Sequence, residues 1–167
     1  MMISRTARFP LLFFYVLFLI SGCAIQLAPN YDKSLYDGIT QSNNDILTLV
    51  AQVADGTSSS DFKQRESTYN SLIGRIDALA LQSNARPVPD SKVIDKVNNY
   101  LTSRGIATVT SSEIPSATAL KEISKNLTKM KQTDQTRGLG KSVVAIFKNA
   151  FIISMDQALT YEAFLER

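Results

Sequence analysis

Apolar residues recur every three or four positions through four long stretches of the chain, and this spacing limits the fold more than any other feature. Residues at i, i+3, i+4 and i+7 lie on one face of an α-helix. The pattern predicts long helices at residues 32–54, 61–83, 116–137 and 141–166, and a short one at 91–103. Each long helix has to bury its apolar face against another element.

Polar turns and proline pairs between these helices predict how they are connected. Asp55-Gly56 and the serines that follow end the first helix and begin the second, and two helices joined by a short turn form an antiparallel hairpin. Arg86-Pro87-Val88-Pro89 interrupts the pattern, because proline lacks an amide donor. It is either a plain connector or a displayed polyproline segment. We predict an all-α protein: an antiparallel four-helix bundle with an additional short helix in the long connection.

Composition excludes several kinds of catalytic and metal site. The chain has no His, no Trp and a single Cys, at position 23. His/Cys metal sites, Ser-His-Asp and Cys-His nucleophiles and internal disulfides are therefore excluded. Asp37 and Asp45 share a helix face, as a carboxylate site would require, although a solvated face explains them more simply. We expect no enzymatic activity, no cofactor and no bound metal.

The first 22 residues have the charge and hydropathy order of a removable export signal. Two arginines, Arg5 and Arg8, precede the ten consecutive apolar residues Leu11 to Ile20. This order is typical of secretory signals, whereas a permanent transmembrane helix needs roughly 20 apolar residues. Removing residues 1–22 takes away both arginines and leaves a formal charge of about +1. Nucleic acid is therefore not an expected partner.

The end of the apolar run, Leu19-Ile20-Ser21-Gly22-Cys23, resembles the lipobox of bacterial lipoproteins. The resemblance implies cleavage between Gly22 and Cys23, diacylglycerol on the Cys23 thiol and a further acyl chain, such as palmitate, on the new amino group. Together these chains anchor a protein durably, at about 0.8 kcal/mol for each buried CH₂. Ala24 stands where enterobacterial lipoproteins carry an Asp that retains them at the inner membrane. The resemblance thus implies a periplasm-facing outer-membrane location, with the outer leaflet of the inner membrane as the alternative.

The lipobox prediction divides the chain into three parts. Residues 1–22 are the cleaved signal peptide, residues 23–30 are the lipid anchor and a short tether, and residues 31–167 are the helical domain. Seven residues between the cysteine and the domain span at most about 23 Å. We therefore expect the domain to lie close to the bilayer, where Tyr31 and Tyr36 either rest at the lipid interface or pack in the core.

Three lysines of the third long helix, Lys121, Lys125 and Lys129, stand at successive i, i+4 positions. Residues 116–148 contain seven basic and two acidic side chains, a local charge of about +5. A solvated face is the simplest interpretation of these lysines. The functional alternative is contact with anionic lipid headgroups or with an acidic partner.

The last predicted helix is apolar on more than one face, since Val143-Val144-Ala145-Ile146-Phe147 is followed by Phe151-Ile152-Ile153. We expect this helix to be the most buried of the bundle. The alternative is a surface that docks a partner or inserts shallowly into lipid.

These features together predict a lipid-anchored bacterial envelope protein that is a non-enzymatic interaction or assembly component at the membrane surface. Its expected partners are the membrane, through lipidated Cys23, and a protein of the envelope. The alternative is a periplasmic helical bundle that binds a small molecule or lipid in an apolar pocket. Such a pocket would be lined by Phe147, Phe151, Met155 and Tyr69.

Overall fold

The computed structural model describes residues 28–106, 108–109 and 113–166, and this part of the chain is helical without any strand. The predicted all-α class is confirmed. Signal peptide, Gly22 and Cys23 lie outside the described residues. The α-helices are α2 (Lys33–Gln52), α3 (Glu66–Asn84), α4 (Ser91–Ser103), α5 (Pro115–Arg137) and α6 (Lys141–Leu165), with a 3₁₀ helix, η2 (Ser59–Gln64), before α3.

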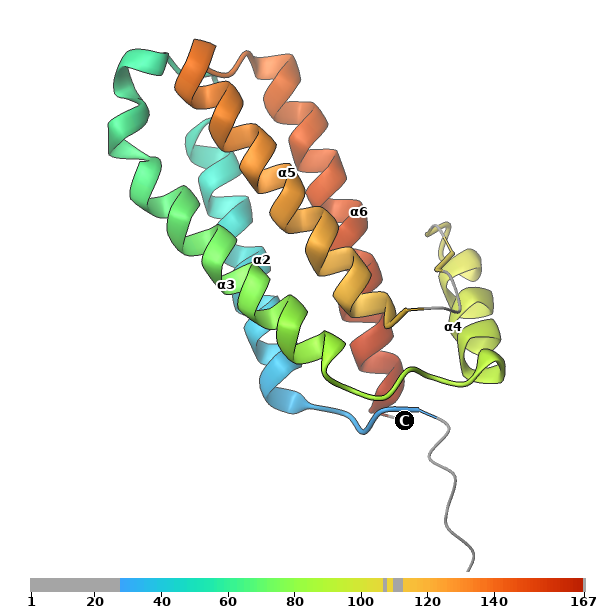
Figure 1. Ribbon diagram of the computed structural model, residues 1–167. Coiled ribbons are helices and arrows are strands. Elements are labelled where there is room, and N and C mark those ends of the chain that lie inside the picture. The colour runs from blue at the N-terminus through green and yellow to red at the C-terminus, as the bar shows by residue number, and fades with distance from the viewer. Residues whose placement is uncertain (1–27, 107, 110–112, 167) are drawn as a thin grey trace, which may run out of the picture.

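Each of the four long helices packs against two of the others. Helix α3 contacts α2 and α5, and helix α6 contacts α5 and α2, while the short α4 packs against α6. The α2–α3 and α5–α6 connections lie at one end of the body (Figure 1), which we call the far end. Residues 28–32, the α3–α4 connection and the last turn of α6 lie at the other end, which we call the tether end.

Helix α2 begins at a side-chain cap that also joins it to α3. The Asp32 carboxylate accepts hydrogen bonds from the backbone amides of Ser34 at 2.9 Å and Leu35 at 3.1 Å. Its second oxygen accepts a bond of 3.0 Å from the Gln82 side chain. The hydrogen bond donated by the Leu35 amide, more than any other contact, lowers the pKa of Asp32 from its ordinary value. This cap satisfies amides that have no partner within the helix.

Replacing Asp32 with alanine is expected to lower the free energy of unfolding by about 1 kcal/mol, because two amides at the start of α2 lose their acceptor. Urea unfolding followed by circular dichroism measures the change. The matched control is Asp37→Ala on the same helix, where the carboxylate is exposed and pairs with the exposed Lys33. We expect that control to change little, and an equal loss for both variants would contradict the capping role.

The main core lies between α2, α3, α5 and α6 and uses the apolar faces predicted from the sequence. Ile39, Ile76 and Leu127, from three different helices, are completely buried. A second, smaller cluster at the tether end contains Val97, Leu101, Ile114, Ala117 and Tyr161. The short helix α4 is therefore held to the body by a small core of its own.

The helix predicted at residues 61–83 is in fact two helices, and the prediction of one continuous helix is wrong. Ser58 caps η2 by accepting a hydrogen bond from the Ser60 amide at 3.3 Å. Arg65, the residue between η2 and α3, turns its side chain inward to a carboxylate of α5. A long-range ion pair thus lies at the residue where η2 ends and α3 begins.

Candidate functional site

Helix α6 places large apolar side chains on its solvent side as well as in the core. Val144, Phe151 and Met155 are at most 3% exposed and pack in the main core. By contrast, Ile146 is 67%, Ile152 45% and Ile153 54% exposed. The prediction that α6 is the most buried helix is therefore wrong: its isoleucines are spread over more faces than its neighbours α2, α4 and α5 can cover.

A groove of about 390 Å³ runs between α2 and α6 and continues this apolar surface. It is lined by Leu47, Val50, Ala51 and Ala54 of α2 and by Lys141, Val144, Ala145, Lys148 and Ile152 of α6. We call the groove together with Ile146 and Ile153 the α2–α6 apolar face. By length and composition alone α6 could cross a membrane, and only 28% of its most apolar stretch is buried.

The three lysines singled out from the sequence share one exposed surface, which we call the α5 lysine ridge. Lys121, Lys125 and Lys129 are exposed on α5, on the side away from the buried Ile123 and Leu127. Lys125 donates to the Glu122 carboxylate at 3.1 Å. Helix α5 packs against α3 and α6, and within the described chain it makes no packing contact with α2. The ridge and the α2–α6 apolar face therefore point in different directions.

The predicted anchor, Cys23, precedes the described residues by a few positions. The body begins at residue 28, at the tether end, and the five residues from Cys23 span at most about 18 Å. Tyr31 and Tyr36 are half-buried there, with their ring centroids 6.2 Å apart. Each ring is thus in contact with the other rather than buried in the main core.

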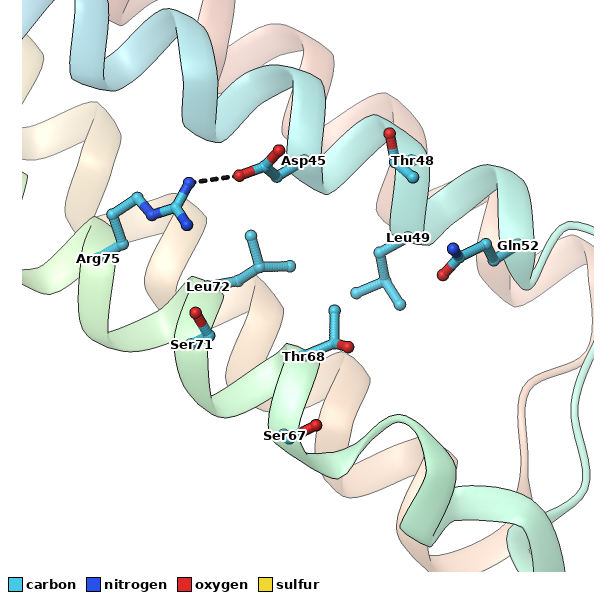
Figure 2. A pocket seen from close by; sticks show the side chains of 9 residues that line it. All are labelled: Asp45, Thr48, Leu49, Gln52, Ser67, Thr68, Ser71, Leu72 and Arg75. Atoms are coloured by element: carbon cyan, nitrogen blue, oxygen red, sulfur yellow. Dashed lines mark hydrogen bonds and ion pairs between the residues drawn. The ribbon is translucent and has the colours of Figure 1, made fainter.

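A second groove, of about 480 Å³, lies between α2 and α3 and is mostly polar (Figure 2). Its side chains come from both helices: Asp45, Thr48, Leu49 and Gln52 from α2, and Ser67, Thr68, Ser71, Leu72 and Arg75 from α3. Asp45 and Arg75 form an ion pair at one end of the groove. The hydroxyl and amide groups can hydrogen-bond a polar molecule, but the one carboxylate is already neutralised by its partner.

The two carboxylates considered from the sequence are not brought together as a site. Asp37 pairs with Lys33 at 2.6 Å, and Asp45 pairs with Arg75 across the α2–α3 groove. Among the described residues, no group of three or more His, Cys, Asp or Glu side chains is placed to hold a metal ion. Each of the two carboxylates thus forms an ion pair with a basic side chain at the surface.

A buried carboxylate organises the far end of the body, in what we call the far-end cluster. Asp134 of α5 is fully buried and accepts bonds from Arg65 Nε at 2.8 Å and Arg65 Nη2 at 2.9 Å. The Thr57 hydroxyl donates to it at 2.5 Å and the Tyr69 hydroxyl at 3.2 Å. A bidentate arginine and two hydroxyls satisfy the carboxylate, which is what makes a buried charge tolerable.

The same cluster fastens the α2–α3 connection to the α5–α6 connection. The Thr57 amide donates to the Leu139 carbonyl at 2.9 Å, and the Leu139 amide donates to the Thr57 hydroxyl at 2.9 Å. Gly138 has φ 72°, and a Cβ there would lie 2.2 Å from the Thr57 carbonyl oxygen. Only glycine fits this close approach, because other residues add a strained conformation to the steric clash.

The protonation of Asp134 follows from two opposing effects. Burial by itself raises the pKa of this carboxyl, but the hydrogen bonds from Arg65, Thr57 and Tyr69 and the charge of Arg65 together lower it below the ordinary value of 3.8. Burial and the neighbouring Asp134 charge raise the pKa of the Tyr69 hydroxyl, so it stays protonated and able to donate. The cluster is therefore an ionised carboxylate held by donors.

The lowered pKa of Asp134 makes part of the stability dependent on acid. A carboxyl with a lower pKa in the folded state contributes stability above its unfolded pKa and loses it as pH falls through the folded value. We therefore expect the free energy of unfolding to decrease as pH is lowered below about 4, and to decrease less steeply in Asp134→Asn. Urea titrations from pH 6 to pH 2 measure both slopes. Identical slopes would contradict the ionised state of Asp134.

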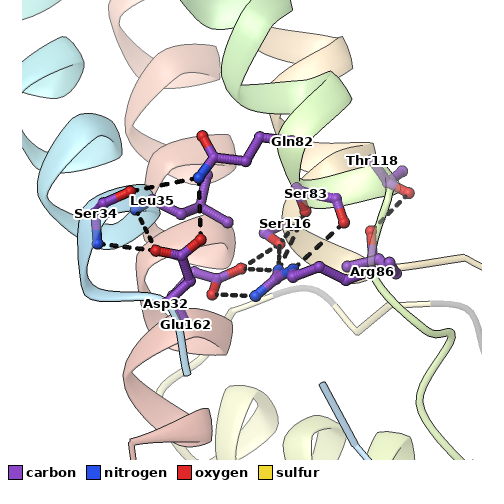
Figure 3. A network of polar contacts seen from close by, with 10 residues as sticks. Asp32, Ser34, Leu35, Gln82, Ser83, Arg86, Ser116, Thr118 and Glu162 are labelled. Atoms are coloured by element: carbon purple, nitrogen blue, oxygen red, sulfur yellow. Dashed lines mark hydrogen bonds and ion pairs between the residues drawn. The ribbon is translucent and has the colours of Figure 1, made fainter. Parts of the chain in front are cut away.

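A second buried carboxylate organises the tether end, in what we call the tether-end cluster (Figure 3). Glu162 of α6 is fully buried and accepts bonds from Arg86 Nη1 at 2.9 Å and from Arg86 Nη2. The Ser116 hydroxyl donates to the same carboxylate, and Ser83 and Ser116 share a bond of 2.7 Å. Residues of α3, the α3–α4 connection, α5 and α6 thus meet at one point. The Arg86-Pro87-Val88-Pro89 segment is accordingly a connector whose first residue is held in the body.

Neither buried carboxylate is among the site residues predicted from the sequence, although a signal is present. Asp134 continues the apolar stripe of Leu127 and Met130, and Glu162 continues that of Met155 and Ala158. A carboxylate at an apolar-stripe position indicates a buried, paired charge, because an unpaired one there is very costly.

The pocket residues considered for ligand binding are packed together instead. Tyr69, Phe151 and Met155 are at most 2% exposed in the main core, and the Phe147 ring stacks on Phe151 with centroids 6.4 Å apart. The two grooves described above lie on either side of α2 and not at these residues.

Comparison of the chain with protein-family models, curated proteins and solved structures gives no match in any of the three. The class of protein is defined by the body itself: an all-helical domain with an exposed apolar face and a separate basic ridge.

Proposed function

We propose that the protein is a lipid-anchored bacterial envelope protein, held through Cys23 at the outer membrane and facing the periplasm. In this proposal the body is an antiparallel four-helix bundle that acts as a non-enzymatic interaction or assembly component. The observation that carries the proposal is the α2–α6 apolar face, with three isoleucines of α6 at least 45% exposed. Large exposed apolar surfaces mark sites of protein or membrane interaction.

A tether as short as residues 23–30 supports this role physically. It restricts the body to a thin layer above the bilayer and so raises its effective concentration towards other envelope components. The α5 lysine ridge, on another side of the body, is the surface we assign to an acidic protein partner. Complementary charge chiefly increases the association rate and the selectivity of such a contact.

Replacing Cys23 with serine is expected to move the protein from the membrane fraction to the soluble periplasmic extract, because serine cannot accept the thioether-linked lipid. Cell fractionation measures the distribution, and the mass of the N-terminal peptide reports the acyl chains. The matched control is Ala24→Ser, one residue further on, which should remain acylated and membrane-bound. Recovery of an unmodified Cys23 in the wild-type protein would overturn the lipoprotein assignment.

The lysine ridge is tested by replacing Lys121, Lys125 and Lys129 together with glutamate. We expect a specific set of envelope proteins, crosslinked to the wild type and identified by mass spectrometry, to be lost from this variant. The control carries the same charge change at three other exposed lysines: Lys63, Lys92 and Lys96. An equal loss in the control, or no specific proteins with the wild type, would contradict the ridge as a partner surface.

The alternative function, binding of a small molecule or lipid, is favoured by one observation, the apolar groove of about 390 Å³ between α2 and α6. Native mass spectrometry of the folded protein would then show a bound molecule. Ala145→Trp fills the groove and should abolish that binding. A wild-type protein that carries no bound molecule would exclude this alternative.

A further inference from the structure

We propose that the α2–α6 apolar face lies on the surface of an anionic bilayer, with Lys141 and Lys148 among the headgroups. The exposed isoleucines of α6 would then reach the boundary between headgroups and acyl chains. This inference rests on the proposed function, because the tether brings the body to the bilayer, and it names the partner of that face.

The first argument is the shape and exposure of the apolar surface. Ile146 and Ile153 are more than half exposed on α6, and Ile152 connects them to the groove that Leu47 and Ala51 of α2 line. The halves of α2 and α6 nearer the far end therefore present a mainly apolar surface, which the exposed Ser142 and Asn149 of α6 interrupt. A helix with an apolar side and flanking lysines lies in the plane of the interface, its apolar side buried at the headgroup and acyl boundary.

The second argument is charge. From Lys141 to Met155, helix α6 has two lysines and no acidic residue. The stripe of α2 on the same side, at i, i+4, i+7 and i+11, is uncharged: Tyr36, Thr40, Asn43 and Leu47. Asp55 at the rim is neutralised by Lys141 at 2.8 Å. Asp156, the next residue of α6, pairs with Arg104 at 3.6 Å. The uncompensated charge at the rim is therefore the positive charge of Lys148, which complements anionic headgroups.

The third argument is the position of the anchor. Residues 28–32 lead across the tether end into α2, and the second half of α2, from Leu47 to Ala54, lines the groove about 21 Å further along the helix. At most about 18 Å of extended chain separates Cys23 from residue 28. An orientation with α2 parallel to the bilayer therefore brings the groove and the start of the tether to the same membrane surface.

A second copy of the chain fits this face less well. A two-fold interface places the same patch of each subunit against the other, so two patches of the same net positive charge would face each other. The α5 lysine ridge, which points elsewhere, remains free for a protein partner when the α2–α6 apolar face is on lipid.

The test uses the full-length protein, purified with its native lipid and reconstituted into vesicles. A polarity-sensitive fluorophore is attached in Ala145→Cys, at the groove, or in Ala78→Cys, an alanine that is also exposed, on α3. In vesicles with phosphatidylglycerol we expect a blue-shifted emission at residue 145, quenched by spin-labelled lipid, and neither effect at residue 78. In pure phosphatidylcholine vesicles the shift at residue 145 should be much smaller.

Charge reversal at one lysine then tests the electrostatic part. Lys148→Glu should lower the ratio of docked to undocked body by about tenfold, whereas Lys129→Glu on the lysine ridge should leave it unchanged. Both lysines are exposed and make no ion pair within the described chain. Circular dichroism verifies that both variants are folded. Equal effects of the two reversals would overturn the proposal.

Three further outcomes separate the proposals from one another. Equal emission at residues 145 and 78, in protein whose Cys23 is acylated by mass, would overturn this inference and leave the lipid anchor intact. A blue shift at residue 145 that grows with protein density and is not quenched by spin-labelled lipid would indicate a second copy and overturn it as well. An unacylated Cys23 with a quenched, lipid-dependent shift would overturn the anchor but support the lipid-binding face.

Discussion

Replacing Asp134 with alanine is expected to lower the free energy of unfolding by about 3 to 5 kcal/mol, because it leaves one partner of a buried ion pair without the other. The Arg65 side chain is only 16% exposed and would keep its charge with no carboxylate to accept its two bonds. The hydroxyls of Thr57 and Tyr69 would lose their acceptor at the same time. The bonds between the two far-end connections would weaken with them.

Urea unfolding followed by circular dichroism measures this loss. The matched control is Asp45→Ala, which breaks the Asp45–Arg75 ion pair at the surface, where both partners are at least 35% exposed. An exposed pair contributes about 1 kcal/mol or less. The double variant Arg65→Met/Asp134→Leu removes both charges and should recover most of the loss. A change below about 1 kcal/mol in Asp134→Ala would show that the far-end cluster does not stabilise the fold.

Replacing Glu162 with alanine, at the opposite end of the body, is expected to lower the free energy of unfolding by the same amount, about 3 to 5 kcal/mol. The Arg86 side chain is 13% exposed and donates two of its bonds to this carboxylate. Without the acceptor, the guanidinium stays near Ser83 and Ser116, which cannot neutralise it. The connection that leads to α4 should therefore become looser.

Hydrogen exchange separates this local effect from general destabilisation. In Glu162→Ala we expect faster amide exchange in α4 than in α2, after correction for the change in overall stability. Glu166→Ala, at an exposed position of the same chain end, serves as the control and should alter neither measurement. Unchanged exchange in α4 together with unchanged stability would contradict the role of the tether-end cluster.

The helices themselves could be predicted from the sequence with little error. The short helix is found at Ser91–Ser103 as predicted, and α6 ends one residue earlier than predicted, at Leu165. Apolar periodicity over three or more turns, with polar or glycine residues at both ends, leaves few alternatives to a helix at these positions. The bounds of α2 and α5 differ from the prediction by one or two residues for the same reason.

The contacts between distant residues could not be predicted. Arg65 and Asp134 are 69 residues apart in the chain, and Arg86 and Glu162 are 76 apart. Periodicity places each carboxylate on a core-facing stripe but does not say which cation will reach it. The break between η2 and α3 lies at Arg65, which makes the first of these pairs, and the local apolar pattern contains no sign of that contact.

The exposed apolar face shows a second property that could not be predicted from the sequence, namely which sides of a helix are covered by its neighbours. A helix with apolar residues on several sides is compatible with deep burial and with an exposed binding surface, because composition does not show how many neighbours it has. Only the positions of α2 and α5 decide that Val144 and Phe151 are buried while Ile146 and Ile153 are not. The candidate surface therefore follows from tertiary structure, whereas the candidate lysines were accessible from spacing alone.

The place of α2 in the body also determines how mechanical load is carried. This helix follows residues 28–32, which lead to the proposed tether, and it has a groove on each side. Its contacts are less extensive than those of α5. In the proposed lipid-anchored protein, a drag on the body relative to the bilayer enters through residues 28–32 and the first turn of α2, beside the Asp32–Gln82 bond. Because residues 28–32 run across the tether end beside the last turn of α6 (Figure 1), that load pulls on the first turn of α2 from the side. The Asp32 cap and its bond to Gln82 are then the first contacts to carry it.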